Sequence, residues 1–202
     1  MAKPLSVTVT DNGPLKLSGE SITLRYCGDP VAVDEGKDLY ICRCGESTNA
    51  PFCDGTHAKN GFVAEPPEAD RKEVKVWEGK TIRTFFNPGA CMHAFYCKPL
   101  NDLRERELEG DADAAAQIAR IVQSCPSGAL SYESRDAPPP PAAQGPSIDI
   151  VEGGEVRMQC AFEINADRLE RQPEDRATLC RCGLSLNKPW CDGRHKKRDG
   201  FR

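Results

Sequence analysis

The sequence has few aromatic residues and no long apolar run. Aromatic side chains make up 6% of the 202 residues, and the mean hydropathy is −0.55. This composition argues against one large hydrophobic core and favours several small modules, which usually need a further constraint such as a bound metal. No segment approaches the roughly 20 apolar residues needed to cross a bilayer, so we expect no membrane span.

The marks of several functional classes are also missing. Residues 1–7 are not followed by the apolar stretch of a secretory signal peptide. The net charge of −4 is too small to indicate a nucleic-acid-binding protein. No nucleophile–base set, phosphate loop or dinucleotide fingerprint is present, so we do not expect an enzyme.

Cysteine, by contrast, is abundant, with 11 residues. Without a secretion signal, we expect a cytoplasmic protein whose thiols are reduced and bind metal. A sixteen-residue motif, C-R-C-G-x-S-x-N-x-P-aromatic-C-D-G-x-H, occurs at 42–57 and again at 180–195. Three cysteines and one histidine in register are typical of a four-ligand soft-metal site. The ligand candidates are Cys42, Cys44, Cys53 and His57 in the first copy, and Cys180, Cys182, Cys191 and His195 in the second.

Ligand types alone leave two kinds of metal site open. Thiolates and imidazole suit both zinc and iron–sulfur clusters. Structural zinc sites favour cysteines separated by two to four residues, whereas the first pair here is C-x-C. Such a pair can hold one iron of a two-iron cluster while the later cysteine and histidine hold the other. The spacing therefore favours iron–sulfur but does not exclude zinc.

The whole motif resembles the CDGSH iron–sulfur (NEET) family at every ligand position of both copies. The resemblance implies one [2Fe-2S] cluster in each copy. Thr56 and Arg194 stand where the family often has serine, and neither is expected to be a ligand. A neutral imidazole in place of a thiolate should raise the reduction potential and make each cluster acid-labile.

Before each motif lie short segments in which apolar and polar residues alternate, a pattern that predicts strands. These lie at 13–17 and 22–27 before the first motif, and at comparable places, 145–150 and 156–160, before the second. Asp54 and Asp192 are positioned to cap a helical turn at the histidine. Family members commonly pair around a twofold axis, so two copies in one chain imply an intramolecular pseudo-dimer in a monomer, or a homodimer.

A different module lies between the repeats. Residues 73–86 predict a β-hairpin, and residues 111–123 predict an amphipathic helix that ends before Pro126. Residues 104–109 predict a solvated helix or loop. Four consecutive prolines indicate an extended linker at 137–146.

Three further cysteines in the middle module form an incomplete ferredoxin pattern. Cys91, Cys97 and Cys125, the last followed by proline, match a bacterial ferredoxin set with Ala94 at the missing position. The segment resembles the divergent 4Fe-4S mono-cluster family. A [3Fe-4S] cluster needs only three thiolates, whereas in a [4Fe-4S] cluster His93 or a solvent species would complete the site. The alternative is three buried thiols in a small core.

The remaining distinctive residues each have a structural interpretation as well as a functional one. Cys27 and Cys160 are expected to be buried, unless a pseudo-twofold axis brings the two thiols together or one supplies the missing ligand. The basic residues at 194–198 form a solvated face or attract an acidic redox partner. Ser47 and Ser185 either donate to cluster sulfur or shape the turn.

Together these features predict an α+β protein made of two small β-rich CDGSH units and a ferredoxin-like module. We expect domains at 1–66, 67–136 and 147–202, with the linker at 137–146. The predicted function is electron transfer or redox sensing through two [2Fe-2S] clusters and one [3Fe-4S] or [4Fe-4S] cluster. Cluster storage or transfer is the alternative, and a zinc-stapled scaffold is a more remote one. The expected partners are redox proteins or apo iron–sulfur acceptors.

Overall fold

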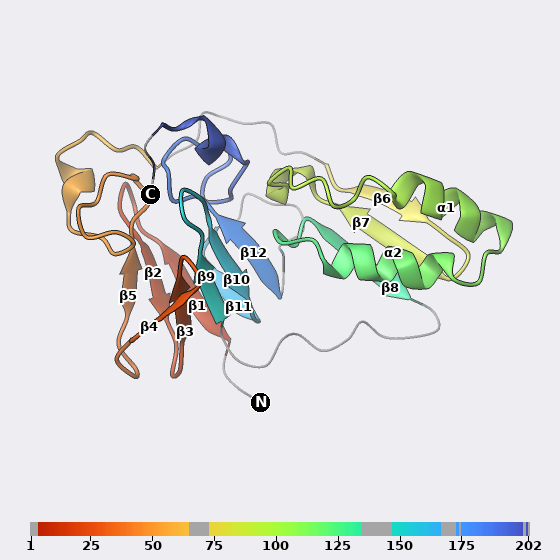
Figure 1. Cartoon of the computed structure of the whole chain (residues 1–202), viewed down its shortest axis with the longest axis horizontal. Coiled ribbons are helices and arrows are strands. Elements are labelled where there is room, and N and C mark those ends of the chain that lie inside the picture. Colours follow the sequence, from red (N-terminus) through yellow and green to blue (C-terminus); the bar gives the residue numbers. More distant parts are fainter. Residues whose placement is uncertain are drawn as a thin grey trace.

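The computed structural model describes residues 4–64, 73–134, 147–166, 173, 175–199 and 201. Two β-sheets and the short 3₁₀ helices η1 (Thr56–Ala58) and η3 (Arg194–Lys197) form one part of the molecule together with the motif loops. A smaller α+β module, which includes the short 3₁₀ helix η2 (Pro88–Ala90), forms the other (Figure 1). Within the described residues, no helix is long and apolar enough to cross a membrane. The predicted linker at 137–146 lies outside the described residues.

Both sheets of the larger part combine strands from the two repeats. The four-stranded sheet has the order β11 (Phe162–Ile164), β1 (Leu5–Val9), β2 (Leu15–Ser18), β5 (Leu39–Ile41). The five-stranded sheet has the order β12 (Arg176–Leu179), β10 (Val156–Gln159), β9 (Ser147–Ile150), β3 (Thr23–Tyr26), β4 (Asp29–Val31). Each sheet therefore depends on both halves of the chain.

The repeats exchange one strand each. β11 of the second repeat pairs in parallel with β1 of the first, and β3 of the first pairs in parallel with β9 of the second. The remaining pairs, within β1–β2–β5 and β9–β10–β12 and between β3 and β4, are antiparallel. This reciprocal exchange has pseudo-twofold symmetry, which confirms that the two repeats pair within the chain.

The structure corrects how the flanking strands of the two repeats correspond. Arg43 donates to the carbonyls of Thr10 and Gly13, and Arg181 donates in the same way to those of Val151 and Gly154. Strand β2 therefore corresponds to β10, not to β9 as the sequence comparison suggested. Strand β1, which the alternating segments at 13–17 and 22–27 do not include, is the counterpart of β9.

Alternating side chains explain why these segments form strands around a shared core. Leu15 and Leu17 of β2, and Val156 and Met158 of β10, are buried while their neighbours are not fully buried. Alternation with period two places such side chains on one face of a sheet. The buried faces of both sheets belong to one apolar cluster.

The middle module is a three-stranded antiparallel sheet with two helices. Its elements are β6 (Lys75–Glu78), β7 (Ile82–Phe86), α1 (Leu100–Glu109), α2 (Ala114–Gln123) and β8 (Leu130–Ser134), with the sheet order β6-β7-β8. The predicted hairpin and the helix before Pro126 are confirmed. Buried Ile118 and Val122 lie on the inner face of α2. Strand β8 was not predicted.

Candidate metal centres

The first motif brings its four candidate ligands together in two pairs. Cys42 and Cys44 follow β5, and their sulfurs lie 3.5 Å apart. Cys53 precedes the short 3₁₀ helix η1 (Thr56–Ala58), and its sulfur lies 3.2 Å from Nδ1 of His57. The pairing of two thiols, and of one thiol with one imidazole, matches the division expected for two irons.

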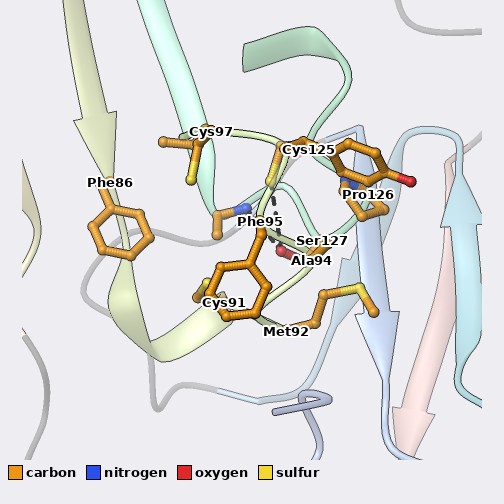
Figure 2. A pocket seen from close by; sticks show the side chains of 12 residues that line it. Phe86, Cys91, Met92, Ala94, Phe95, Cys97, Cys125, Pro126 and Ser127 are labelled. Atoms are coloured by element: carbon orange, nitrogen blue, oxygen red, sulfur yellow. Dashed lines mark hydrogen bonds between the residues drawn. The ribbon is translucent and has the colours of Figure 1, made fainter. Parts of the chain in front are cut away.

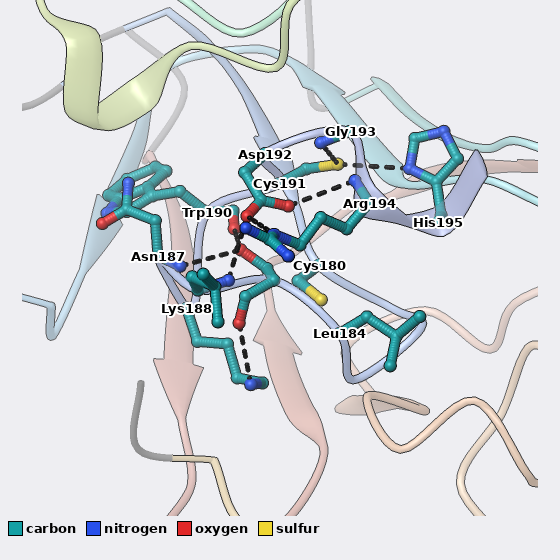
Figure 3. A network of polar contacts seen from close by, with 12 residues as sticks. Cys180, Leu184, Asn187, Lys188, Trp190, Cys191, Asp192, Gly193, Arg194 and His195 are labelled. Atoms are coloured by element: carbon teal, nitrogen blue, oxygen red, sulfur yellow. Dashed lines mark hydrogen bonds and ion pairs between the residues drawn. The ribbon is translucent and has the colours of Figure 1, made fainter. Parts of the chain in front are cut away.

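The second motif repeats this arrangement after β12. The sulfurs of Cys180 and Cys182 lie 3.9 Å apart. The sulfur of Cys191 lies 3.4 Å from Nδ1 of His195, which belongs to η3 (Arg194–Lys197) (Figure 3). In both motifs, therefore, Nδ1 faces the site, and Nε2 is the outer nitrogen.

The same local hydrogen bonds shape both loops. Ser47 and Ser185 donate their hydroxyl protons to the carbonyls of Phe52 and Trp190, 2.6 and 2.7 Å away. The hydroxyl oxygens in turn accept backbone amides two residues on. These serines shape the turn, and the structure shows no bond from either hydroxyl to a ligand sulfur.

The aspartate of each Cys-Asp-Gly segment holds the loop to the start of the helical turn. Asp54 accepts the amide of Thr56 and both the amide and the hydroxyl of Thr48. These bonds to Thr56 and Thr48 lower the pKa of Asp54 well below its usual range. Asp192 accepts the amides of Leu186 and Arg194 at the equivalent positions. Each aspartate thus accepts the first amide of its helical turn, as predicted, although the N-cap residues themselves are Gly55 and Gly193.

Burial differs between the two sites. All four candidate ligands of the second site are buried, whereas Cys53 and His57 of the first are partly exposed. Burial raises the pKa of the Cys191 thiol to about 12 and lowers the pKa of the His195 imidazole. A neutral imidazole is the form that ligates metal.

Two buried arginines, one inside each C-R-C segment, lie close to cysteines of the other repeat. Arg43 and Arg181 are each 2% exposed. Burial lowers the pKa of Arg43 to about 10, and the charge of Cys180 opposes that shift. Burial also lowers the pKa of Arg181, against the charges of Tyr26 and Cys42.

These cations provide a test of whether an anionic cluster suits the site. A buried cation is costly unless negative charge lies nearby. Among the described residues, Nη1 of Arg43 is buried without a hydrogen-bond partner. Thiolates around a two-iron core leave a net negative charge, which would compensate both arginines. The residues present therefore fit an iron–sulfur cluster.

The two sites meet at the pseudo-twofold axis. Nη1 of Arg198 donates to the carbonyls of both Cys44 and Cys182, and Nη2 lies 3.1 Å from Glu46. Gly45 and Gly183, both at positive φ, allow the two motif loops to approach each other closely. A Cβ on Gly45 would lie 3.1 Å from the Cys182 carbonyl, and one on Gly183 would lie 3.3 Å from that of Cys44.

A buried carboxylate distinguishes the second site. Oε2 of Glu155 lies 3.5 Å from Nε2 of His195, and Oε1 lies 2.6 Å from Nε of Arg157. Glu155 is 2% exposed, and its side chain lies close to both Cys191 and His195. Its counterpart at the start of β2 is Pro14, so the first site lacks this carboxylate. Sequence reasoning missed Glu155 because no repeated motif contains it.

The three cysteines of the middle module line one pocket (Figure 2). Cys91 and Cys97 come from the loop after β7, and Cys125 follows α2. Ala94 lines the pocket where a fourth cysteine would stand in a ferredoxin. His93 is exposed and is not part of the lining. The structure therefore brings the three thiols together but does not bring the imidazole of His93 to them.

The two unassigned cysteines differ in burial. Cys160 is buried as predicted, whereas Cys27 is exposed, so that prediction is wrong for Cys27. The amide of Cys27 donates to Ile150 at one end of β9, while Cys160 follows Gln159, which pairs with Ser147 at the other end. The two thiols therefore do not meet at the pseudo-twofold axis.

Three regions of the chain match protein-family models. Residues 12–58 and 148–196 match the iron-binding zinc finger CDGSH type, and residues 77–135 match the divergent 4Fe-4S mono-cluster family. No curated protein and no solved structure matches the chain. The chain is a tandem CDGSH protein with a divergent 4Fe-4S domain between its repeats, and hence an iron–sulfur protein.

Proposed function

We propose that the protein transfers electrons through three iron–sulfur centres. The observation that carries this proposal is the convergence of candidate ligands at three separate places in one small chain. Two are the paired cysteine and histidine sites, and the third is the three-cysteine pocket. Iron–sulfur clusters are one-electron carriers, and several close to each other in one protein suit a relay.

The proposed ligands divide among the three centres as follows. Each CDGSH site holds a [2Fe-2S] cluster, and the middle site holds a [3Fe-4S] or [4Fe-4S] cluster. When bound, the clusters supply reversible one-electron chemistry. The proposed ligands are Cys42, Cys44, Cys53 and His57; Cys180, Cys182, Cys191 and His195; and Cys91, Cys97 and Cys125.

The surrounding residues affect the charge balance and the geometry of the two CDGSH centres. The buried guanidiniums of Arg43 and Arg181 offset negative charge and so favour the reduced state. The serine and aspartate bonds hold the ligand loops in place, which keeps the geometry of oxidised and reduced states similar. All 11 cysteines are free, which fits the reducing conditions of the cytoplasm, and we propose this compartment as the location.

Cluster storage or transfer is a second candidate for the first CDGSH site. His57 and Cys53 are partly exposed, so an acceptor protein can approach these ligands directly. The same route is closed at the second site, where all four ligands are buried. The observation supports release from one site only, and not from the whole protein.

A single experiment separates electron transfer from cluster transfer. The anaerobically purified protein is reduced and reoxidised repeatedly while visible absorption and iron content are followed, and is then incubated with an apo-ferredoxin. Electron transfer predicts reversible bleaching with the iron retained. Loss of iron to the apo-ferredoxin, without reversible reduction, would contradict the proposal and support cluster transfer.

A further inference from the structure

The middle module packs against the second CDGSH repeat. A Cβ added to Gly193, next to the candidate ligands Cys191 and His195, would lie 2.8 Å from the Met92 carbonyl of the middle module. The matching glycine of the first repeat, Gly55, has a similar φ of +86° and nothing within 4 Å of such a Cβ. The contact is therefore specific to one repeat.

A second contact lies on the other side of the three-cysteine pocket. Gly128, three residues after Cys125, approaches the second repeat so closely that a Cβ would overlap the Arg176 carbonyl. Nη2 of Arg176 lies 3.4 Å from the Leu130 carbonyl. Both segments that carry middle-module cysteines thus rest on the second repeat.

A loop of the middle module and the second CDGSH site also line one cavity of about 370 Å³. Met92, Ala94 and Tyr96, from the loop between Cys91 and Cys97, line one side. His195 and Glu155 line the other side. His195 therefore shares this cavity with the loop that joins Cys91 to Cys97.

The first CDGSH site occupies the opposite end of this series. It meets the second site at the axis, where Arg198 bridges the carbonyls of Cys44 and Cys182. Its own histidine, His57, is partly exposed. In Figure 1, η3 lies between η1 and the middle module, so the three sites follow one another across the molecule.

We infer that electrons pass between the three centres in a fixed order. One external partner exchanges electrons at the middle centre, the second CDGSH centre connects it to the first, and a second partner docks at the exposed edge of His57. This order rests on the proposed electron-transfer function. Each step moves one electron, oxidising one centre as the next is reduced, and the external donor and acceptor proteins complete the balance.

The order can be tested by disrupting the contact between the middle module and the second repeat. Asparagine tolerates positive φ better than other residues with a Cβ, so Gly193→Asn should insert a side chain against Met92 with little backbone strain. Gly55→Asn makes the same change where no neighbour lies, and is the matched control. Iron content and visible absorption establish that both variants keep their clusters.

Electron paramagnetic resonance of the reduced protein then reports which centres are neighbours. His57→Cys and His195→Cys each replace the proposed histidine ligand of one CDGSH centre. The signal that each substitution alters therefore belongs to that centre. The order predicts that the middle-centre signal is broadened by the centre that His195→Cys alters. Gly193→Asn should reduce this broadening, whereas Gly55→Asn should leave it unchanged. The order would be overturned if the first CDGSH centre broadened the middle-centre signal instead. It would also be overturned if that signal showed no broadening in protein that holds all its clusters.

Chemical modification supplies a second test that needs no ligand variant. The chain has three histidines, His57, His93 and His195, so peptide mapping after diethylpyrocarbonate treatment distinguishes them. In the loaded protein, His57 should react through its outer nitrogen and His195 should be protected. Gly193→Asn should remove that protection. Equal reaction of His57 and His195 in the unaltered protein would overturn the order.

Failure of the underlying function gives a different result. A protein that purifies with its clusters but cannot be reversibly reduced contradicts electron transfer, and the order then fails with it. A protein that is reversibly reduced but shows the wrong neighbours contradicts the order alone.

Discussion

The two CDGSH repeats share one motif but occupy different environments. Both have the same pairs of candidate ligands, the same serine and aspartate bonds, and an equivalent buried arginine. The second repeat adds a buried carboxylate at Glu155 and contact with the middle module, while the first leaves His57 partly exposed. A repeated motif therefore specifies the ligand loop, whereas the rest of the chain determines how accessible each site is.

Removal of one ligand should produce the largest difference between the repeats. Cys191→Ala and Cys53→Ala should each lose about two irons per chain, because each removes a proposed ligand of a two-iron cluster. Cys191 is buried and Cys53 is partly exposed, so Cys191→Ala should also lower Tm further. Iron analysis and thermal unfolding test both effects. Equal Tm values for the two variants would contradict the burial difference.

Truncation of the aromatic residue before the third cysteine should be the next largest effect. Trp190 is 0% exposed, whereas its counterpart Phe52 is only partly buried. Trp190→Ala should cost about 3–5 kcal/mol, or roughly 6–20 °C in Tm. Phe52→Ala should cost clearly less. Calorimetry of the loaded protein gives the comparison, and a larger loss for Phe52→Ala would show that the first repeat carries the core.

Substitution of Arg198 should lower the stability of the fold, because its side chain joins the two sites at the axis. Its counterpart in the first repeat is Asn60, so Arg198→Asn makes the repeats alike. The change removes bonds from a charged donor to two backbone carbonyls and should cost about 1.5–3 kcal/mol. The exposed neighbour Lys197 is the control, and Lys197→Asn should stay within about 0.5 kcal/mol. Urea unfolding measures both, and equal costs would contradict a bridging role for Arg198.

Glu155→Gln should have the smallest effect of the four, confined to the second site. The carboxylate lies beside the outer nitrogen of His195, and loss of such a partner typically weakens metal binding about 10- to 100-fold. Cluster release to a chelator should therefore be faster from the second site and unchanged at the first. Glu152→Gln, in the same turn and exposed, is the control. Equal release rates in the two variants would remove any role for Glu155 in holding His195.

Particular residues show what was predictable from sequence. Alternation at Leu15 and Leu17, or at Val156 and Met158, predicts strands from local pattern alone. The reciprocal pairing of β1 with β11 and of β3 with β9 was not predictable, because parallel pairing joins segments more than 100 residues apart. Strand β1 was missed although Leu5, Val7 and Val9 alternate, so the signal was present and unused.

The site shows the same division between local and long-range information. The motif spacing predicts the cysteine pairs and the capping aspartates, since these depend on residues a few positions apart. The contact of Gly193 with Met92, and that of Glu155 with His195, join segments that share no motif. Cys27 was predicted to be buried from residue type, but its place at the end of β3 leaves it exposed.

The metal content of anaerobically purified protein shows whether the chain holds three iron–sulfur centres. Iron, sulfide and zinc are measured together with electron paramagnetic resonance before and after reduction. Three centres predict about seven to eight irons per chain, with two [2Fe-2S] signals and one [3Fe-4S] or [4Fe-4S] signal. A colourless protein with stoichiometric zinc would contradict the account, and about four irons with only [2Fe-2S] signals would remove the middle centre from it.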